Sequence, residues 1–192
     1  MLRCVSVLTG PRTRAALGSL LFLVVAPGVA AGLVPWWLTG WDAAGDVPWP
    51  VVAVGVVLVA TGAGVLLHAF ARFVVEGIGT PAPVAPPGQL VVGGLYRYVR
   101  NPMYLAVTAT IAGQALILGR PALLLYAAAF VAAVASFVRF YEEPTLARRF
   151  GAQYDAYRRA VPAWWPRRPR EVSRTAARGG PRPGGGRRGA RG

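Results

Sequence analysis

Four long apolar runs constrain this chain more than any other feature of its sequence. They cover roughly residues 15–34, 50–70, 102–118 and 121–141. A helix needs about 20 mostly apolar residues to cross a bilayer, and the backbone inside lipid must satisfy its own hydrogen bonds. We therefore predict an all-α integral membrane protein with about four transmembrane helices, in a single membrane domain over residues 1–166.

The glycines inside the first two runs indicate helix packing. Gly28 and Gly32 have the spacing of a close helix contact, and Pro27 beside them predicts a kink. Val29-Ala30-Ala31 resembles a signal-peptide cleavage site, but further apolar runs follow it, so we expect an uncleaved first span. In the second run, Thr61-Gly62-Ala63-Gly64 lacks the strand–helix context of a dinucleotide site, so we expect packing there too.

The charge of the chain indicates how it lies in the membrane. The net charge is +14, and all 21 basic residues are arginine. Only Arg120 lies in a loop that we place outside; the other arginines lie before the first span, between the second and third, or from Arg139 onward. The positive-inside rule then puts both termini in the cytoplasm, and the tryptophans of residues 35–49 form an aromatic belt on the outer side.

Composition also excludes some classes of function. With apolar runs this long, the positive charge favours topology or contact with anionic headgroups, so we expect no nucleic-acid partner. Cys4 and His68 are the only cysteine and histidine, so the sequence predicts no metal site. The arginine-only, alanine-rich composition favours a GC-rich bacterial genome, and hence the bacterial inner membrane. We expect no obligate protein partner.

A glycine- and tyrosine-rich stretch, Gly93–Tyr104, precedes the third run. Asn101 is a favoured residue for capping a helix start, and Pro102 suits the first helical position. The positive end of that helix, together with Arg97 and Arg100, favours an anionic group at this point. A basic loop with tyrosines at the membrane interface is the alternative interpretation.

A second cluster, Glu142 and Glu143, ends the fourth run. Carboxylates at the end of a spanning helix are costly to desolvate and therefore suggest a function. The alternative is an ordinary pair of one glutamate with Arg139 in water. Pro144 predicts that the helix kinks or breaks at Glu143. Because the third and fourth runs form an antiparallel hairpin, Asn101-Pro102 and Glu142-Glu143 should lie close together.

The C-terminal part predicts one further helix and then disorder. Residues 144–160 alternate an apolar face with an arginine-rich face, which is typical of an interfacial amphipathic helix that can cap the pocket. Gly151 should weaken this helix by roughly 1 kcal/mol. Residues 167–192 are rich in Arg, Gly and Pro without periodicity, so we expect a disordered tail.

These motifs resemble those of a known superfamily over about Gly79 to Pro166. The stretch Gly94–Tyr104 is similar to the Arg-His-Pro-x-Tyr motif region of isoprenylcysteine carboxyl methyltransferases. Tyr141-Glu142-Glu143-Pro144 and Phe150-Gly151-x-x-Tyr154-x-x-Tyr157 complete that signature, and the same motifs resemble phospholipid N-methyltransferases. Asn101 stands where the carboxyl methyltransferases carry histidine, so no role of that histidine transfers to this chain.

The resemblance implies a multi-span α-helical enzyme that binds S-adenosylmethionine at the cytoplasmic face. It implies a lipid-like methyl acceptor with a carboxylate or an amine, and catalytic roles for Glu143 and Arg100. An amine acceptor would need a base, and a glutamate with a raised pKa suits that role. The cofactor-binding residues that follow from the matching motifs are Gly94, Tyr96, Arg97, Arg100, Asn101, Pro102, Tyr104, Glu142 and Glu143.

Two other classes of function compete with a methyltransferase. A membrane-bound reductase of related architecture would bind a reduced nicotinamide cofactor and no sulfonium compound. A non-catalytic membrane or transport protein would bind neither, and would need polar residues deep inside its spans, which are scarce here. Cofactor binding therefore discriminates among the three.

Overall fold

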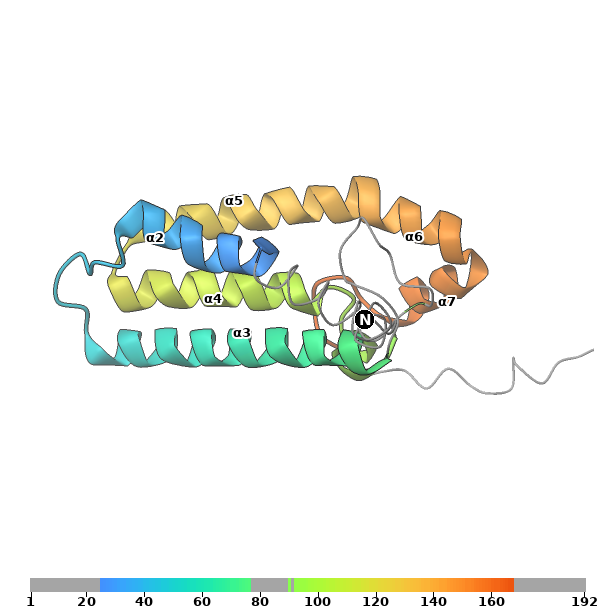
Figure 1. The fold of residues 1–192 in the computed structure, drawn as a ribbon, viewed down its shortest axis with the longest axis horizontal. Helices are drawn as coiled ribbons and strands as arrows, with labels where there is room; N and C mark the ends of the chain where they lie inside the picture. Colours follow the sequence, from blue (N-terminus) through green and yellow to red (C-terminus); the bar gives the residue numbers. More distant parts are fainter. Residues whose placement is uncertain (1–24, 77–89, 91, 168–192) are drawn as a thin grey trace, which may run out of the picture.

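The computed structural model describes residues 25–76, 90 and 92–167, and within these ranges the chain is helical without strands. A first helix, Val25–Thr39, contains the π-helical segment η2 (Val29–Leu33) and α2 (Val34–Thr39). It is followed by α3 (Trp49–Glu76), α4 (Pro102–Leu118) and α5 (Pro121–Phe137). These helices run side by side along the long axis of the molecule (Figure 1). The predicted all-α class is confirmed.

Two of the described helices are long and apolar enough to cross a membrane. They are Trp49–Arg72 and Pro121–Phe150, with mean hydropathies of 2.4 and 2.1. The apolar helices Val25–Thr39 and Pro102–Leu118 are shorter. At 1.5 Å per residue, α4 is only about 26 Å long, slightly less than the ~30 Å hydrocarbon core of a bilayer. The number of four spans therefore stays a prediction.

Glycines bring α3 and α4 into close contact. A Cβ atom on Gly55 would lie 2.7 Å from the carbonyl oxygen of Gly113, and one on Gly62 would lie 2.7 Å from that of Ala106. Only a residue without a side chain allows this approach. The packing predicted for Gly62 is therefore confirmed. The packing predicted for Gly32 and Gly64 was wrong among the described residues, because a Cβ atom on either would meet no neighbouring element within 4 Å.

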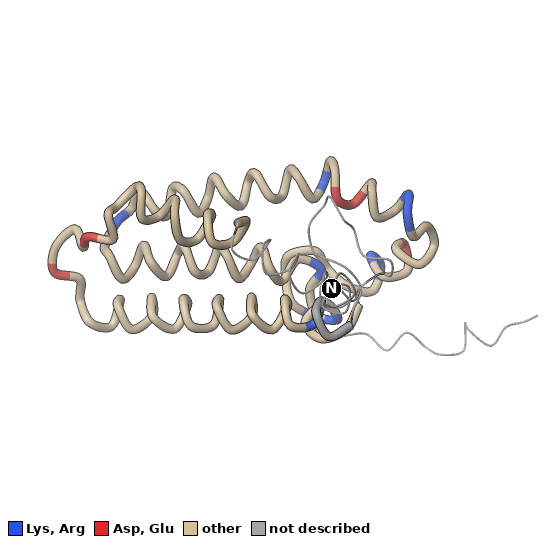
Figure 2. Tube along the Cα trace, viewed as in Figure 1, with Lys and Arg blue, Asp and Glu red and all other residues tan. Residues whose placement is uncertain are grey.

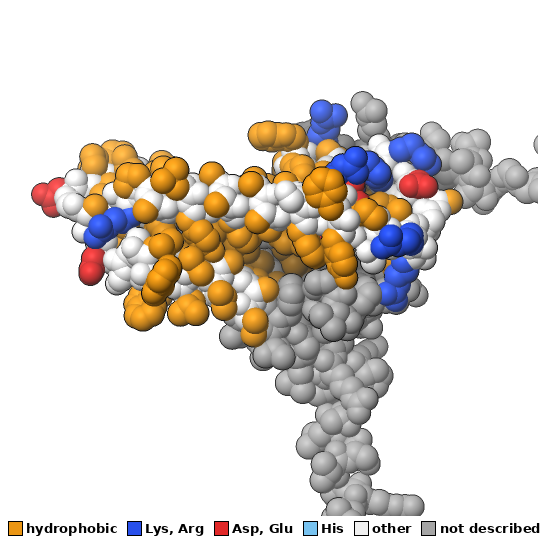
Figure 3. Space-filling view, turned by 90° about the horizontal axis from the view of Figure 1, so that it is seen from above, with side chains coloured by type: hydrophobic (Ala, Val, Ile, Leu, Met, Phe, Trp, Pro, Cys, Tyr) orange, Lys and Arg blue, Asp and Glu red, His pale blue; other side chains and the backbone are white. Residues whose placement is uncertain are grey.

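The surface of the bundle is apolar along its length and charged at its ends (Figures 2 and 3). At one end, α2 continues to Thr39, so Trp36 and Trp37 lie on a helix and the expected outer loop begins only at Gly40. Arg120 in the α4–α5 turn donates from its Nε to the carbonyl oxygen of Asp42 at 3.0 Å. Most of the other described arginines gather at the opposite end (Figure 2).

Of the kink or break predicted at Glu143, the break does not occur, because a π-helical segment accommodates Pro144. The segment η4 (Val138–Glu142) follows α5, and the N–H of Glu143 bonds to the carbonyl oxygen of Val138, five residues back. Pro144 has no N–H and clashes with the preceding turn of a regular α-helix, so a locally wider turn avoids both costs. The helix continues as α6 (Glu143–Phe150).

The predicted interfacial helix 144–160 is divided in two. Gly151 adopts φ +50° and ψ −128°, outside the helical region, and α7 (Ala152–Ala160) begins after it. Glycine tolerates this backbone conformation because it has no Cβ. The arginine-rich face that we predicted is exposed, and it comprises Arg148, Arg149, Asp155, Arg158 and Arg159. The proline-rich segment 79–88, residues 15–24 and the tail from 168 lie outside the described residues.

Candidate active site

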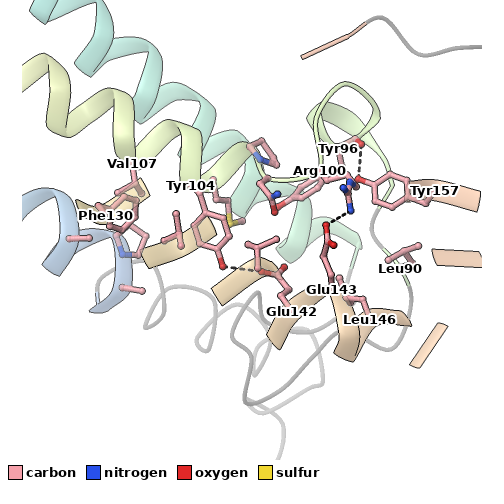
Figure 4. A pocket seen from close by; sticks show the side chains of 18 of the residues that line it. Leu90, Tyr96, Arg100, Tyr104, Val107, Phe130, Glu142, Glu143, Leu146 and Tyr157 are labelled. Atoms are coloured by element: carbon pink, nitrogen blue, oxygen red, sulfur yellow. Dashed lines mark hydrogen bonds and ion pairs between the residues drawn. The ribbon is translucent and has the colours of Figure 1, made fainter. Parts of the chain in front are cut away.

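The α4–α5 hairpin brings the two predicted clusters together. Gly119, at φ +62°, ends α4, and α5 starts two residues later at Pro121. The opposite ends of the hairpin therefore meet, as expected from the sequence. Tyr104 in the first turn of α4 contacts Glu142 in η4, and Arg100 just before α4 contacts Glu143 at the start of α6 (Figure 4).

The residues at this end enclose a cavity of about 340 Å³. This volume lies within the range of about 300–1,000 Å³ that is common for small-molecule sites. The lining comes from the first helix, the loop before α4, and the helices α4 to α7. The residues are Ala26, Pro27, Ala30, Leu90, Tyr96, Arg100, Asn101, Pro102, Met103, Tyr104, Val107, Phe130, Val134, Val138, Glu142, Glu143, Leu146, Tyr154 and Tyr157.

The cavity has a polar half and an apolar half. In Figure 4, Arg100, Glu143 and Tyr157 lie toward one side, together with Leu90 and Leu146. Val107 and Phe130 lie toward the other side. The apolar half is completed by alanines and Pro27 of the first helix. The pair of Tyr104 and Glu142 lies between the halves. This arrangement suits a molecule with one charged end and one apolar end.

Arg100 and Glu143 form the central ion pair of the polar half. Arg100 Nη1 lies 2.8 Å from Glu143 Oε1, and their side chains are only 12% and 10% exposed. The same Nη1 donates to the hydroxyl of Tyr154 at 3.0 Å. Arg158, on the surface of α7, approaches the other oxygen of Glu143 at 3.7 Å. Among the described residues Glu143 thus pairs with arginines on other elements, and not with Arg139.

Glu142 has a different environment from its neighbour. The hydroxyl of Tyr104 donates to Glu142 Oε2 at 3.1 Å. No arginine of the described residues forms an ion pair with Glu142. The two adjacent carboxylates therefore differ: Glu143 is held by cations, whereas Glu142 faces the cavity with a neutral partner. A cation or an amine entering the cavity would meet Glu142 as an available partner.

Hydrogen bonds join the C-terminal segment to the loop before α4. The N–H of Arg100 donates to the carbonyl oxygen of Pro162 at 2.9 Å, and the N–H of Arg167 donates to that of Tyr98 at 3.0 Å. The hydroxyl of Tyr157 donates to the carbonyl oxygen of Tyr96 at 2.8 Å. These bonds join the loop before α4 to α7 and the segment after it.

Asn101 contributes to this connection and not to a helix cap. It precedes α4 as predicted, but no side-chain capping bond forms. Its Nδ2 donates to the carbonyl oxygen of Ala163 at 3.2 Å, and the residue is buried. The predicted capping interaction was therefore wrong, because the side chain is directed to the C-terminal segment. The first turn of α4 lies beside the cavity, and its backbone N–H groups receive no hydrogen-bond acceptor from the side chain of Asn101.

Burial keeps the two tyrosines of α7 protonated. Removal from water raises the pKa of Tyr154 and of Tyr157 above the ordinary value for tyrosine. For Tyr154, the nearby Arg100 opposes this effect without cancelling it. Both hydroxyls therefore remain neutral hydrogen-bonding groups at physiological pH, and they position the ion pair and the loop without adding charge.

The structure places seven of the nine predicted cofactor residues in the cavity wall, and two elsewhere. Those in the wall are Tyr96, Arg100, Asn101, Pro102, Tyr104, Glu142 and Glu143. Gly94 adopts φ +57° at the start of the turn η3 (Gly94–Arg97), outside the lining, and Arg97 is exposed over the ring of Tyr98. Their assigned roles stay predictions.

Sequence reasoning assigned no site role to several residues of the wall. Tyr154 and Tyr157 were visible as parts of a motif, but their bonds to Arg100 and Tyr96 depend on the packing of α7. Val107, Phe130 and Val134 were visible only as residues of apolar runs. No pattern in the sequence distinguishes an apolar residue that lines a cavity from one that faces lipid.

The donor set of the polar half fits S-adenosylmethionine. Arg100 lines the cavity, and its guanidinium, which Glu143 holds in place, can bind a cofactor carboxylate. Glutamate oxygens suit ribose hydroxyls or the amino group. By contrast, the described part of the chain has no cluster of three or more residues that could hold a metal ion.

Comparison with known protein families identifies one family for this chain. The family described as phospholipid methyltransferase matches residues 50–153, which extend from the start of α3 into α7 and include both clusters. Comparisons with curated proteins and with solved structures gave no match. The family match covers more than half of the 192 residues. The chain belongs to the phospholipid methyltransferase family.

Proposed function

We propose that this protein transfers a methyl group from S-adenosylmethionine to an amine or a carboxylate of a lipid-like acceptor in the membrane. The observation that carries the proposal is the division of one cavity into a charged half and an apolar half. A charged, water-soluble cofactor suits the first, and the chain of a lipid suits the second. Because both halves share one space, donor and acceptor can meet without leaving the protein.

The polar half is proposed to bind the cofactor. Arg100 offers its guanidinium to the carboxylate, and the first turn of α4 adds its positive end. Glu143 fixes Arg100 from the other side at 2.8 Å. When bound, the cofactor supplies an activated methyl group on a sulfonium. The contribution of these residues is then mainly to hold the reactants in line, which is a large effect in group transfer.

We assign the role of base to Glu142, whereas the catalytic glutamate implied by the resemblance was Glu143. Glu143 is already engaged by two arginines, whereas Glu142 has only the Tyr104 hydroxyl among the described residues. Glu142 also lies between the halves, where the reactive end of an acceptor would be. For an amine acceptor, Glu142 accepts the proton that the nitrogen must lose; a carboxylate acceptor needs no base.

The charge distribution supports a cytoplasmic site. The arginines of α6 and α7 surround the cavity end of the bundle (Figure 2), which the positive-inside rule places in the cytoplasm, where the cofactor is available.

A labelling experiment tests the proposal. Purified protein in lipid nanodiscs is incubated with S-adenosylmethionine that carries a labelled methyl group and with either phosphatidylethanolamine or a prenylated cysteine. We expect label in one lipid product and none with Arg100→Gln. If neither acceptor becomes labelled and the protein binds a reduced nicotinamide cofactor, the result would favour a reductase. If the protein binds neither cofactor, the result would favour a non-catalytic protein.

A further inference from the structure

Two side chains fasten the first helix to the α4–α5 hairpin, and the proposed chemistry uses neither of them. Gln114 of α4 donates from Nε2 to the carbonyl oxygen of Ala31 at 2.7 Å. Tyr126 of α5 donates from its hydroxyl to the carbonyl oxygen of Ala30 at 2.9 Å. The acceptors are neighbouring residues of η2, so two different helices hold the same short segment.

The segment they hold is the irregular turn of the first helix. In η2 the N–H of Val34 bonds to the carbonyl oxygen of Val29, five residues back, so the turn is wider than in an α-helix. Backbone groups at membrane depth need partners inside the protein, because lipid offers none. Gln114 and Tyr126 supply such partners from outside the helix. Their bonds therefore fix both the position and the irregular shape of this turn.

The same turn forms a wall of the apolar half of the cavity. Ala30 lines the cavity, and both Ala30 and Ala31 pack against a buried cluster of Val107, Ile111 and Ala127. Ile111 is fully buried and lies two turns along α4 from Tyr104, beyond the last lining residue of that helix, Val107. On α4 the lining therefore ends between Val107 and Ile111, about 5–10 Å from Tyr104 by the helical rise, and the cluster lies at this end of the apolar half.

We infer that Gln114 and Tyr126 are positioning residues that set the length of apolar chain accepted by the cavity. This inference rests on the proposed function, because it assigns the apolar half to the chain of the lipid. The two bonds hold the first helix against the closed end. When they are removed, the first helix can move away from α4 and α5, the apolar half deepens, and longer chains fit.

Conservative variants separate this role from general stability. Tyr126→Phe removes the hydroxyl and keeps the ring, which packs against the cluster. Gln114→Leu keeps the size of the side chain. It also removes Oε1, which is buried without a partner among the described residues, and the gain in stability from removing this atom offsets part of the loss of the hydrogen bond. Ser136→Ala is the control: its hydroxyl bonds to Ala132 within α5 at 2.8 Å and does not reach the first helix.

Binding and transfer are measured on the full chain with the same probes. Detergent-solubilised protein is mixed with equal amounts of short-, medium- and long-chain phosphatidylethanolamine, and the bound species are counted by native mass spectrometry. Labelled S-adenosylmethionine then reports methyl transfer to each lipid. We expect the ratio of long- to short-chain lipid bound to rise about fivefold in each variant, equivalent to ~1 kcal/mol, and to stay unchanged in the control.

The possible results separate the chain-length role from the proposed function. If the ratio of long- to short-chain lipid bound shifts in the variants but no protein, including the wild type, transfers a methyl group, the role of the two residues stands. Methyl transfer to this lipid is then refuted. If the wild type transfers a methyl group but the ratio of long- to short-chain lipid bound does not change in either variant, the inference is overturned and the proposed function stands. If Ser136→Ala shifted the ratio equally, the effect would be general loosening of the bundle, and the inference would also be wrong.

Discussion

Neutralising Glu143 should weaken cofactor binding far more than neutralising Glu142. Glu143 fixes Arg100 through a bond of 2.8 Å between two side chains that are 12% and 10% exposed. Glu142 bonds to the hydroxyl of Tyr104 at 3.1 Å. The variant Glu143→Gln keeps the size and one acceptor oxygen but loses the charge that orients Arg100 toward the polar half.

The magnitude follows from the kind of bond that is lost. Hydrogen bonds to a charged group contribute about 1.5–3 kcal/mol, against about 1 kcal/mol for neutral pairs. Because a misplaced Arg100 loses its own charged bond to the carboxylate of the ligand, we expect Glu143→Gln to raise the Kd of S-adenosylhomocysteine roughly ten- to a hundredfold. In Glu142→Gln the amide oxygen can still accept from Tyr104, so the Kd should change less than about threefold. Methyl transfer to an amine should nevertheless fall by roughly 10²–10⁴, because the base is lost.

The assay is calorimetric titration of S-adenosylhomocysteine into wild type and both variants, with thermal unfolding measured in parallel. Asp155→Asn is the matched control, because Asp155 is an exposed carboxylate in the first turn of α7 and its loss should leave the Kd unchanged. Equal affinity in wild type, Glu142→Gln and Glu143→Gln would refute the assignment of the pocket. A loss of affinity in Glu142→Gln alone would show that the two glutamates have the opposite roles to those we assign.

Three further predictions concern topology, the tail and the α6–α7 junction. A reporter fused after Gly119 should report the outside of the membrane and one fused after Arg168 the inside; any reversal contradicts the proposed orientation. Removal of residues 171–192 should leave insertion and binding of S-adenosylhomocysteine intact, because this segment has no apolar face; a truncated protein that binds nothing would contradict this. Gly151→Ala should lower stability by about 1–3 kcal/mol, since alanine rarely adopts φ +50° with ψ −128°; an unchanged melting temperature would show that the junction tolerates a side chain.

Periodicity and turn residues identified the helices because these signals are local. The apolar run and Pro102 predicted α4, and Gly119 with Pro121 predicted the turn after it. A hairpin of two helices must bring its open ends together, so the proximity of the Asn101 and Glu142 regions also followed. Helix ends were predicted less well: α3 continues to Glu76, because charged residues extend a helix beyond the apolar run without ending it.

Local rules failed where a tertiary contact or an irregular turn offered a lower free energy. Pro144 would break a regular helix, but the π-helical turn before it allows the helix to continue. Asn101 would cap α4, but its amide bonds to Ala163, far along the chain. Neither outcome follows from propensity, because each depends on a wider turn or a partner that only the folded chain provides.

The sequence by itself determined the class of this protein and the residues from which a site could be built. Apolar runs of spanning length, arginines on one side and two clustered motifs are properties of composition and spacing. Only the tertiary structure decided that Glu143 pairs with Arg100, that Glu142 faces the cavity, and that Gln114 and Tyr126 hold the first helix. These contacts depend on distances between residues far apart in the chain and on which carboxylate a buried arginine reaches. No local sequence pattern encodes either.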